Sequence, residues 1–511
     1  RHIGSGTGRH IGAEQSLVLP VERSTGRIFL TVETRAVNVS APLTYSLSVD
    51  IRPPDPAQVN VLALSDDAAL RLGFAGADNP HGDAQWARLA QAREQLLAAP
   101  HVRGRLIDLG AIDEPDFAAA RQHWLSGSGT PAAANRYAAA IQHWLQAERE
   151  RSPSARAVLL IGDDATIPHA RLADHPRPGL AGAWTHESDY RSDSGIDKDS
   201  AVGRALELNL ILSDDVYATA DPLWADGQPL APPSWPVGRI IGLPDDMAGL
   251  MTAFAADPAS ARLDRSLVAG WDFMDDAAAA AADALGHGRA PDDHVSLTGA
   301  AWDRQRLGAL LQGAWPFTFL AMHADHRRLT GPDGPVVDAR ALDSNASPSG
   351  AGVALACHSG LHVPDGDDKS GAGDLPEAWL KRAYAFVGST GWAYGLRGAV
   401  GYEERLLVDV TRRLASGADA TLGDALVEAK RSYHLTHPLD RFHYKTRVGT
   451  ILFGLPLVSL RPADTAPRQA APDIAPVRRE RRPMNAADAR PVAAGARLAA
   501  DSGAIAERKE W

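Results

Sequence analysis

From Val59 onward, short apolar runs alternate with helical stretches, and this alternation constrains the fold more than any other feature. Strands that alternate with helices are typical of parallel sheets covered by helices on both faces. The pattern predicts strands at Asn60–Leu64, Gly104–Leu109, Ala157–Gly162, Leu208–Ser213, Gly238–Gly242, Ser266–Gly270, Phe317–His323, Gly352–Cys357, Ala385–Ser389 and Leu457–Leu460. Helical periodicity predicts helices at Ala84–Ala98, Pro115–Trp124, Ala132–Glu150, Asp245–Ala255, Asp275–Leu285, Trp302–Leu311, Glu403–Ser416 and Leu422–Tyr433.

A single sheet of this many strands would be unusually wide, so we expect two α/β subdomains with largely parallel sheets. We place them at residues 57–255 and 256–461. Residues 1–56 combine a Gly- and Ser-rich start with short β-branched runs and a proline-rich linker, which predicts a flexible start and a small β-rich segment. Residues 462–511 have few large apolar side chains, which predicts an extended or disordered tail, or one bound to a partner protein.

Composition excludes several classes of function. The chain has 511 residues with 52 Lys plus Arg and 63 Asp plus Glu, a net charge of −11, which argues against a nucleic-acid partner. No apolar run approaches the roughly 18 residues of a membrane span. The single cysteine excludes an internal disulfide framework and multi-cysteine metal centres. The glycine-rich segments lack the dinucleotide fingerprint and a Walker lysine, so nothing supports nucleotide binding.

Two predicted strands end on residues that carry chemistry. One apolar run ends at His323-Ala324, and another ends at Cys357-His358. Working residues of open α/β sheets gather at the carboxyl ends of strands, and a thiol beside an imidazole suits acyl transfer. Backbone N–H groups nearby would stabilise an oxyanion. His326 and His358 are alternatives for the imidazole, and a buried structural thiol is the simpler alternative for Cys357.

The chain resembles the gingipain-like cysteine peptidases, which are caspase-fold enzymes. Eight short, collinear segments carry this resemblance over roughly residues 59–461: VLLIGDDATIP (158–168), SDDVY (213–217), VGRI (237–240), ALACHSG (354–360), DLPEAW (374–379), FVGSTGWAYG (386–395), GDALVEAK (423–430) and LFGLP (452–456). The resemblance implies a caspase-like three-layer fold, with a non-catalytic α/β subdomain before the catalytic one.

The resemblance also implies roles for single residues. Cys357 would be the nucleophile and His323 its proton partner, with no third orienting acid required. The backbone N–H groups of Cys357 and Ala324 would form the oxyanion hole. The family usually has Gly where this chain has Ala324, and alanine disfavours a positive φ there.

The sequence says less about the pocket that binds the substrate residue before the scissile bond. The resemblance implies that Trp392 forms a pocket wall, against the alternative of a core aromatic. Asp214, or its neighbour Asp215, would lie at the pocket base and select Arg or Lys through a charge-assisted pair. Capping a helix or holding a turn is the alternative for these acids.

Three further clusters weigh less. The acidic, Gly-rich loop 365–374 resembles a calcium loop in charge but not in EF-hand spacing, so a structural calcium ion and a mobile loop are both open. His434 and His437, with His443 further on, suggest zinc ligands, but no third ligand stands in the standard zinc spacing with a Glu base. The end of a surface helix is therefore the favoured interpretation of these histidines. Asp163 and Asp164 are expected to organise the turn before Ile167-Pro168.

We therefore expect a cysteine-type endopeptidase that cleaves a protein or peptide substrate through a thioester and needs no cofactor. The alternative is a catalytically degenerate binding or scaffold domain of a multidomain secreted protein. Family habit favours an exported bacterial protein that is activated by its own cleavage, while the sequence leaves the compartment open.

Overall fold

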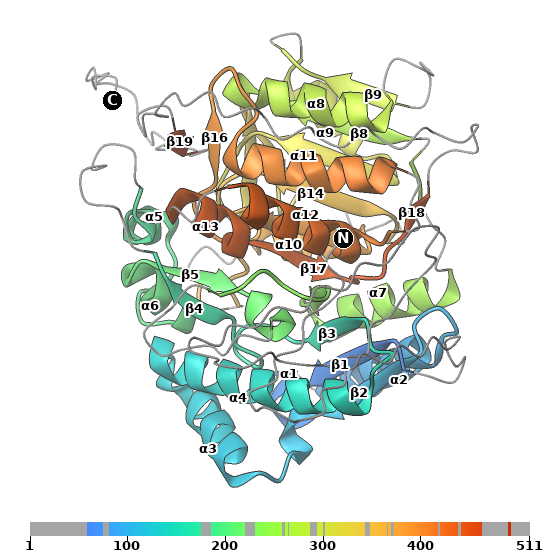
Figure 1. Ribbon diagram of the computed structural model, residues 1–511, viewed down its shortest axis with the longest axis vertical. Helices are drawn as coiled ribbons and strands as arrows, with labels where there is room; N and C mark the ends of the chain where they lie inside the picture. Colours follow the sequence, from blue (N-terminus) through green and yellow to red (C-terminus); the bar gives the residue numbers. More distant parts are fainter. Residues whose placement is uncertain are drawn as a thin grey trace, which may run out of the picture.

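A computed structural model gives the fold of most of the chain (Figure 1). It describes residues 59–74, 81–174, 185–219, 230–257, 261–263, 265–286, 294–299, 302–342, 348–364, 366–368, 373–416, 420–437, 441–461 and 489–491. The expected β-rich segment at 1–56 lies outside the described residues. So does the tail at 462–511, apart from a short strand at residues 489–491.

Ten strands form one central sheet. In spatial order they are β2 (Gly104–Asp108), β1 (Val61–Ser65), β3 (Ala157–Ile161), β6 (Val237–Ile240), β17 (Thr450–Gly454), β15 (Ala385–Ser389), β14 (Ala351–Leu355), β10 (Phe317–Ala321), β8 (Ser266–Gly270) and β9 (His294–Leu297). The predicted α/β fold with largely parallel strands is confirmed. The two sheets expected from its width are instead joined into one, because β17 pairs with both β6 and β15. The subdomain boundary near residue 255 stays a prediction.

The sheet consists of two blocks of mutually parallel strands joined by β17. Strands β2, β1, β3 and β6 form the first block, and β15, β14, β10, β8 and β9 form the second block. Strand β17 lies between β6 and β15 and pairs antiparallel with β15. The Tyr384 hydroxyl, just before β15, donates to the carbonyl of Asp257 at the end of α7, so the amino ends of the two blocks lie at the same edge of the sheet.

Helices cover both faces of the sheet (Figure 1). In the first block, Val61 and Ala63 join the core under α2 and α7, while Leu62 and Leu64 face the core under α3 and α4. This alternation follows from the two-residue period of a strand. The helices are α1 (Asp67–Phe74), α2 (Gly82–Ala98), α3 (Pro115–His123), α4 (Pro131–Arg151), α5 (Glu187–Ser194), α6 (Ala201–Glu207), α7 (Pro244–Ala256), α8 (Asp275–Leu285), α9 (Arg304–Leu311), α10 (Leu375–Leu380), α11 (Tyr402–Ala415), α12 (Leu422–Thr436) and α13 (Arg441–Gly449).

Four small sheets complete the fold. They are β11 (His323–Ala324) with β12 (Arg328–Gly331) and β13 (Gly334–Asp338), β4 (Ala170–Ala173) with β5 (Leu210–Ser213), β7 (Ala261–Arg262) with β18 (Leu460–Arg461), and β16 (Tyr394–Leu396) with β19 (Ala489–Pro491). The strand predicted at Leu208–Ser213 is thus β5, outside the central sheet. The strand predicted at Leu457–Leu460 is wrong, since the sheet strand is β17 at Thr450–Gly454. None of the described helices is long and apolar enough to cross a membrane.

Candidate active site

Three neighbouring strands, β8, β10 and β14, are each followed by a polar residue at the same position in the register of the sheet. In the register of the sheet, Ala321 of β10 lies opposite Gly270 of β8 on one side and Leu355 of β14 on the other. Two residues beyond each of these stand Asp272, His323 and Cys357. Because the three strands are parallel neighbours, the structure brings Cys357 and His323 to one edge of the sheet, together with an acid that the sequence analysis did not name.

Cys357 is buried, and its thiol contacts the backbone of Ala393. The N–H of Ala393 donates to Sγ at 3.3 Å, and the thiol faces the carbonyl oxygen of Ala393 at 3.6 Å. Burial raises the pKa of the Cys357 thiol well above its ordinary value, with smaller contributions from Glu403 and Glu187 that also raise it. Burial thus favours the neutral thiol, although the hydrogen bond from the Ala393 N–H acts in the other direction.

His323 lies at the start of β11, with its imidazole held between aromatic and acidic neighbours. Its Nε2 faces Oδ2 of Asp272 at 3.4 Å, and the Trp271 and Phe273 rings meet it edge-on at centroid distances of 5.1 and 6.1 Å. Asp272 adopts a positive φ of 58°, which turns the chain sharply after β8. The arrangement orients the imidazole and places a carboxylate beside it.

Ala324 follows as extended backbone in β11, paired with Leu329. The described non-glycine residues with positive φ do not include Ala324. Alanine is therefore accommodated at position 324 without backbone strain. The assignment of its N–H, and that of Cys357, to an oxyanion hole stays a prediction.

His358, the residue after Cys357, points into the protein interior. It is fully buried at a positive φ of 55°, and its ring stacks on Tyr190 with centroids 3.4 Å apart. Its Nε2 is 2.8 Å from Oε2 of Glu187. Burial lowers the pKa of His358, although Glu187 raises it in part. His358 thus belongs to the packed interior.

His326 has a similar interior environment. Its Nδ1 lies 2.5 Å from the Tyr190 hydroxyl, its Nε2 lies 3.2 Å from Oδ2 of Asp368, and its side chain is buried. Both alternatives for the imidazole role are therefore engaged in buried contacts, whereas the His323 side chain is 14 % exposed.

Glu187 connects helix α5 to the segment that covers Cys357. Its Oε1 accepts from the Trp392 backbone N–H at 3.0 Å and pairs with Lys445 at 2.7 Å. Lys445 also pairs with Asp174 at 2.5 Å. Burial raises the pKa of Glu187, but Lys445 and His358 outweigh it and hold the value at about 2. Burial raises the pKa of Asp174 to about 6.

Trp392 is largely buried in this cluster. Its indole N–H donates to the His186 carbonyl at 3.0 Å, and its ring meets Tyr190 and His358 edge-on. A role for Trp392 as a pocket wall stays a prediction.

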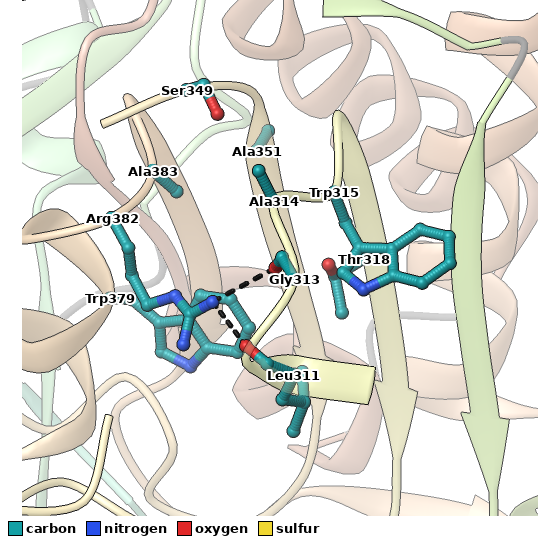
Figure 2. A pocket seen from close by; sticks show the side chains of 10 residues that line it. All are labelled: Leu311, Gly313, Ala314, Trp315, Thr318, Ser349, Ala351, Trp379, Arg382 and Ala383. Carbon is teal, nitrogen blue, oxygen red and sulfur yellow. Dashed lines mark hydrogen bonds between the residues drawn. The ribbon is translucent and has the colours of Figure 1, made fainter. Parts of the chain in front are cut away.

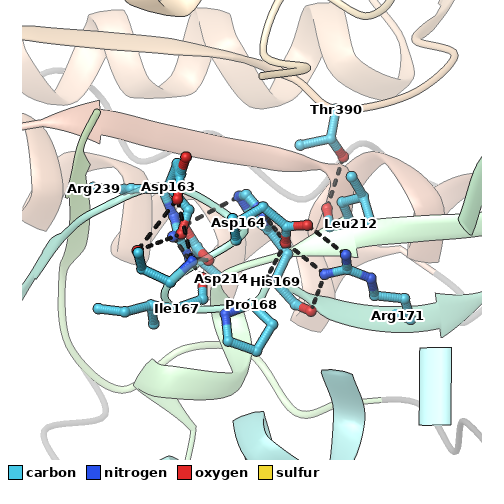
Figure 3. Close-up of polar contacts among 12 residues, drawn as sticks. Asp163, Asp164, Ile167, Pro168, His169, Arg171, Leu212, Asp214, Arg239 and Thr390 are labelled. Atoms are coloured by element: carbon cyan, nitrogen blue, oxygen red, sulfur yellow. Dashed lines mark hydrogen bonds and ion pairs between the residues drawn. The ribbon is translucent and has the colours of Figure 1, made fainter. Parts of the chain in front are cut away.

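Asp214 and Asp215 each have a cationic partner inside the protein, and Figure 3 shows that of Asp214. Arg239 donates to Asp214 through Nη2 at 2.6 Å and Nε at 2.9 Å, and its Nη1 donates to the Ile167 carbonyl. Lys430 donates to Asp215 at 2.6 Å. Burial raises the pKa of Asp214, but Arg239 outweighs it, so the net shift is downward. The structure places both acids in these internal pairs and gives them no polar contact with Cys357 or His323 among the described residues.

Asp164 organises the turn after β3, as expected. It accepts a bidentate pair from Arg171 at 2.6 and 2.5 Å, and it accepts the His169 N–H at 2.8 Å (Figure 3). Asp163 accepts the Thr166 N–H at 3.2 Å. Arg171 pairs with Leu212 in the β4–β5 sheet, and the Leu212 carbonyl accepts from the Thr390 hydroxyl just beyond β15 (Figure 3).

The remaining clusters do not assemble a metal site in the described part of the chain. No group of three or more His, Cys, Asp or Glu side chains there could hold a metal ion. Asp365 and residues 369–372 of the acidic loop lie outside the described residues, while Asp368 contacts His326 and Arg327. His443 bonds to the Tyr433 hydroxyl, and His437 lies on the Tyr433 carbonyl at the end of α12.

A small hollow lies at the other end of strands β10 and β14. Thr318 and Ala351 line it near the amino ends of β10 and β14, and Arg382 closes it with hydrogen bonds to the Leu311 and Gly313 carbonyls (Figure 2). The length of these strands separates it from Cys357 and His323, so it is not part of the candidate site.

No family model and no curated protein matches the chain. Among solved structures, the chain is similar to gingipain R, an Arg-specific cysteine proteinase, with a TM-score of 0.49, 12% identity and coverage of 80% of this chain and 79% of that one. The complex of the pro- and mature domains of Porphyromonas gingivalis RgpB matches with a TM-score of 0.48 and 12% identity, and the match covers 79% of this chain and 80% of that one. The Saccharomyces cerevisiae separase–securin complex matches with a TM-score of 0.32 and 11% identity, and the match covers 43% of this chain and 14% of that one. With every TM-score below 0.5, none of these likenesses assigns the chain to a family.

Proposed function

We propose that the protein is a cysteine endopeptidase with Cys357 as nucleophile and His323 as its proton partner. The observation that carries this proposal is the shared register of β10 and β14. Ala321 pairs with Leu355, and His323 and Cys357 each lie two residues beyond this pair. A thiol and an imidazole at one edge of a sheet suit acyl transfer, because the imidazole can manage the protons that the thiol chemistry requires.

In the proposed reaction, Cys357 Sγ bonds to the scissile carbonyl carbon, and the thiol proton passes to His323. The oxyanion rests on the N–H groups of Cys357 and Ala324. When the C–N bond breaks, His323 protonates the leaving amine, which leaves a thioester. Water then attacks the thioester, giving the carboxylic acid product and restoring the thiol.

Asp272 acts as a positioning residue in this proposal. Its carboxylate faces His323 Nε2, so it stabilises the imidazolium that forms during the reaction. The contact is 3.4 Å at rest, and catalytic contacts commonly tighten once substrate is bound.

The test is cleavage of a fluorogenic peptide library by the wild type and by Cys357→Ala and His323→Ala. We expect both variants to lose cysteine-dependent cleavage while keeping the wild-type melting temperature. His123→Ala, which removes an exposed imidazole at the end of α3, is the matched control and should retain full activity. Cleavage that survives in Cys357→Ala contradicts the proposal.

One observation favours a second candidate, a binding domain that retains an inert thiol. Cys357 is fully buried, and Ala393 contacts its sulfur through both N–H and carbonyl. Iodoacetamide separates the two, because Cys357 is the only thiol of the chain. A thiolate activated by His323 is alkylated at mildly acidic pH faster than a free cysteine, whereas an inert buried thiol is alkylated far more slowly.

A further inference from the structure

Strand β16 begins directly beside the thiol. Its first residue, Tyr394, follows Ala393, whose backbone contacts Cys357 Sγ on both its N–H and its carbonyl side. Whatever pairs with β16 therefore lies next to the nucleophile.

The partner of β16 comes from the far end of the sequence. Strand β19 pairs antiparallel with it, with Tyr394 opposite Pro491 and Leu396 opposite Ala489 (Figure 1). In this register the chain from 489 to 491 runs toward Ala393 and hence toward the thiol.

The hydrogen-bonding pair of this ladder follows from its residues. Antiparallel partners alternate between pairs that exchange two hydrogen bonds and pairs that exchange none. Tyr394 and Pro491 cannot exchange two hydrogen bonds, because proline has no backbone N–H. The Leu396 N–H donates to Glu404 Oε2 at 3.0 Å, so it is turned away from β19. Both facts place the exchanged pair at Gly395 and Arg490.

Glu404 fixes the other side of β16. The same Oε2 accepts the Gly401 N–H at 2.8 Å, and a Cβ on Gly395 would come within 2.5 Å of Glu404 Oε1. The strand is thus held against α11 on one side, and its backbone on the other side is presented for pairing.

We propose that β16 is a peptide-docking edge and that residues 489–491 of this chain occupy it in cis, as an added strand that an extended peptide substrate must displace. Strand addition gives affinity through main-chain hydrogen bonds and tolerates many side chains, which suits a self-bound segment. The blocking role rests on the proposed peptidase function, whereas the docking of β19 does not.

The experiment compares full-length wild type with Arg490→Pro and Arg490→Ala. Proline removes the N–H that pairs with Gly395, while alanine keeps the backbone donor and is the matched control. Hydrogen exchange over residues 394–396 reports the pairing, iodoacetamide alkylation reports access to Cys357, and peptide hydrolysis reports activity.

We expect faster exchange at β16 in Arg490→Pro alone, with alkylation and hydrolysis both rising by a factor of about ten as the accessible fraction increases. Faster exchange and alkylation with no hydrolysis in any variant would support the docked strand and count against the peptidase function. Equal exchange and alkylation in all three proteins would overturn the inference, whatever the hydrolysis rates. Faster exchange with unchanged alkylation would also overturn it, because β19 would then not block the thiol.

Discussion

The backbone N–H of Trp392 donates a hydrogen bond to Oε1 of Glu187 across 3.0 Å. These two residues lie far apart in the sequence, and the contact holds the segment 391–393 over the buried thiol. Gly391 is required at this contact, because a Cβ there would come within 2.5 Å of the same carboxylate oxygen. The cover of Cys357 is therefore fixed from α5, in the first half of the chain.

Glu187→Gln should destabilise the protein. The change removes the negative charge that faces buried Lys445, and breaking one partner of a buried pair typically costs about 3–5 kcal/mol. We expect the free energy of unfolding in denaturant to fall by an amount of this order. Glu207→Gln is the control, because Glu207 is half exposed in its pair with Arg191 and should change stability by less than about 1 kcal/mol. Equal effects of the two substitutions would contradict the positioning role of Glu187.

Asp272→Asn should lower kcat about tenfold and leave KM nearly unchanged, as expected when a charge-assisted hydrogen bond of ~1.5 kcal/mol is lost in the transition state. The reason is that Asp272 contacts the proton partner His323 rather than a substrate group. Steady-state kinetics measure both constants. Asp333→Asn, which alters another partly exposed acid in the β12–β13 turn, is the control. A rise in KM with constant kcat would instead place Asp272 in substrate binding.

His362 should make stability fall in alkaline solution. Burial lowers the pKa of His362, but its 2.6 Å pair with Asp374 outweighs it and raises the value to about 9 from 6.5. A raised folded-state pKa contributes stability that is fully present below pH 6.5 and is lost as the pH rises through 9. The contribution is on the order of 3 kcal/mol for this shift.

Melting temperatures at pH 6, 7.5 and 9 test this dependence in wild type and His362→Gln. The wild type should lose more stability over this range than the variant, which has no imidazole to deprotonate. Parallel curves for the two proteins would exclude His362 as the source.

Asp214→Asn separates a structural acid from a specificity acid. Because Arg239 is fully buried and pairs with Asp214, the variant should lose about 3–5 kcal/mol of stability. The ratio of kcat/KM for peptides with Arg and with Ala before the scissile bond should stay unchanged at a temperature where the variant is folded. A selective loss of cleavage after Arg would restore Asp214 to the substrate pocket.

Much of the architecture was predictable because buried strands and amphipathic helices have clear periods. The strands at Ser266–Gly270 and Ala385–Ser389 coincide with the prediction. The strand-end rule placed His323 and Cys357 at one edge of the sheet, as the register of β10 and β14 has them.

The misses have physical reasons. Asp272 follows a predicted strand, but one acid after an apolar run is an ordinary helix-start signal, and only the register with β10 shows its partner. Asp214 looked available for a cationic ligand because the sequence does not reveal that Arg239 faces it. Residues 450–454 form a short apolar run after a helix, and length alone did not separate this strand from Leu457–Leu460.

The position of β17 has a consequence for the order of events during synthesis. Phe453 pairs with Arg239, more than two hundred positions earlier, and β17 also completes the edge of β15. Until residues 450–454 emerge from the ribosome, the sides of β6 and β15 that β17 covers in the folded protein are unpaired strand edges. Such edges readily pair with other chains. A nascent chain stalled before this point would therefore be prone to aggregation, and chaperones would be needed longest at the seam between the two blocks.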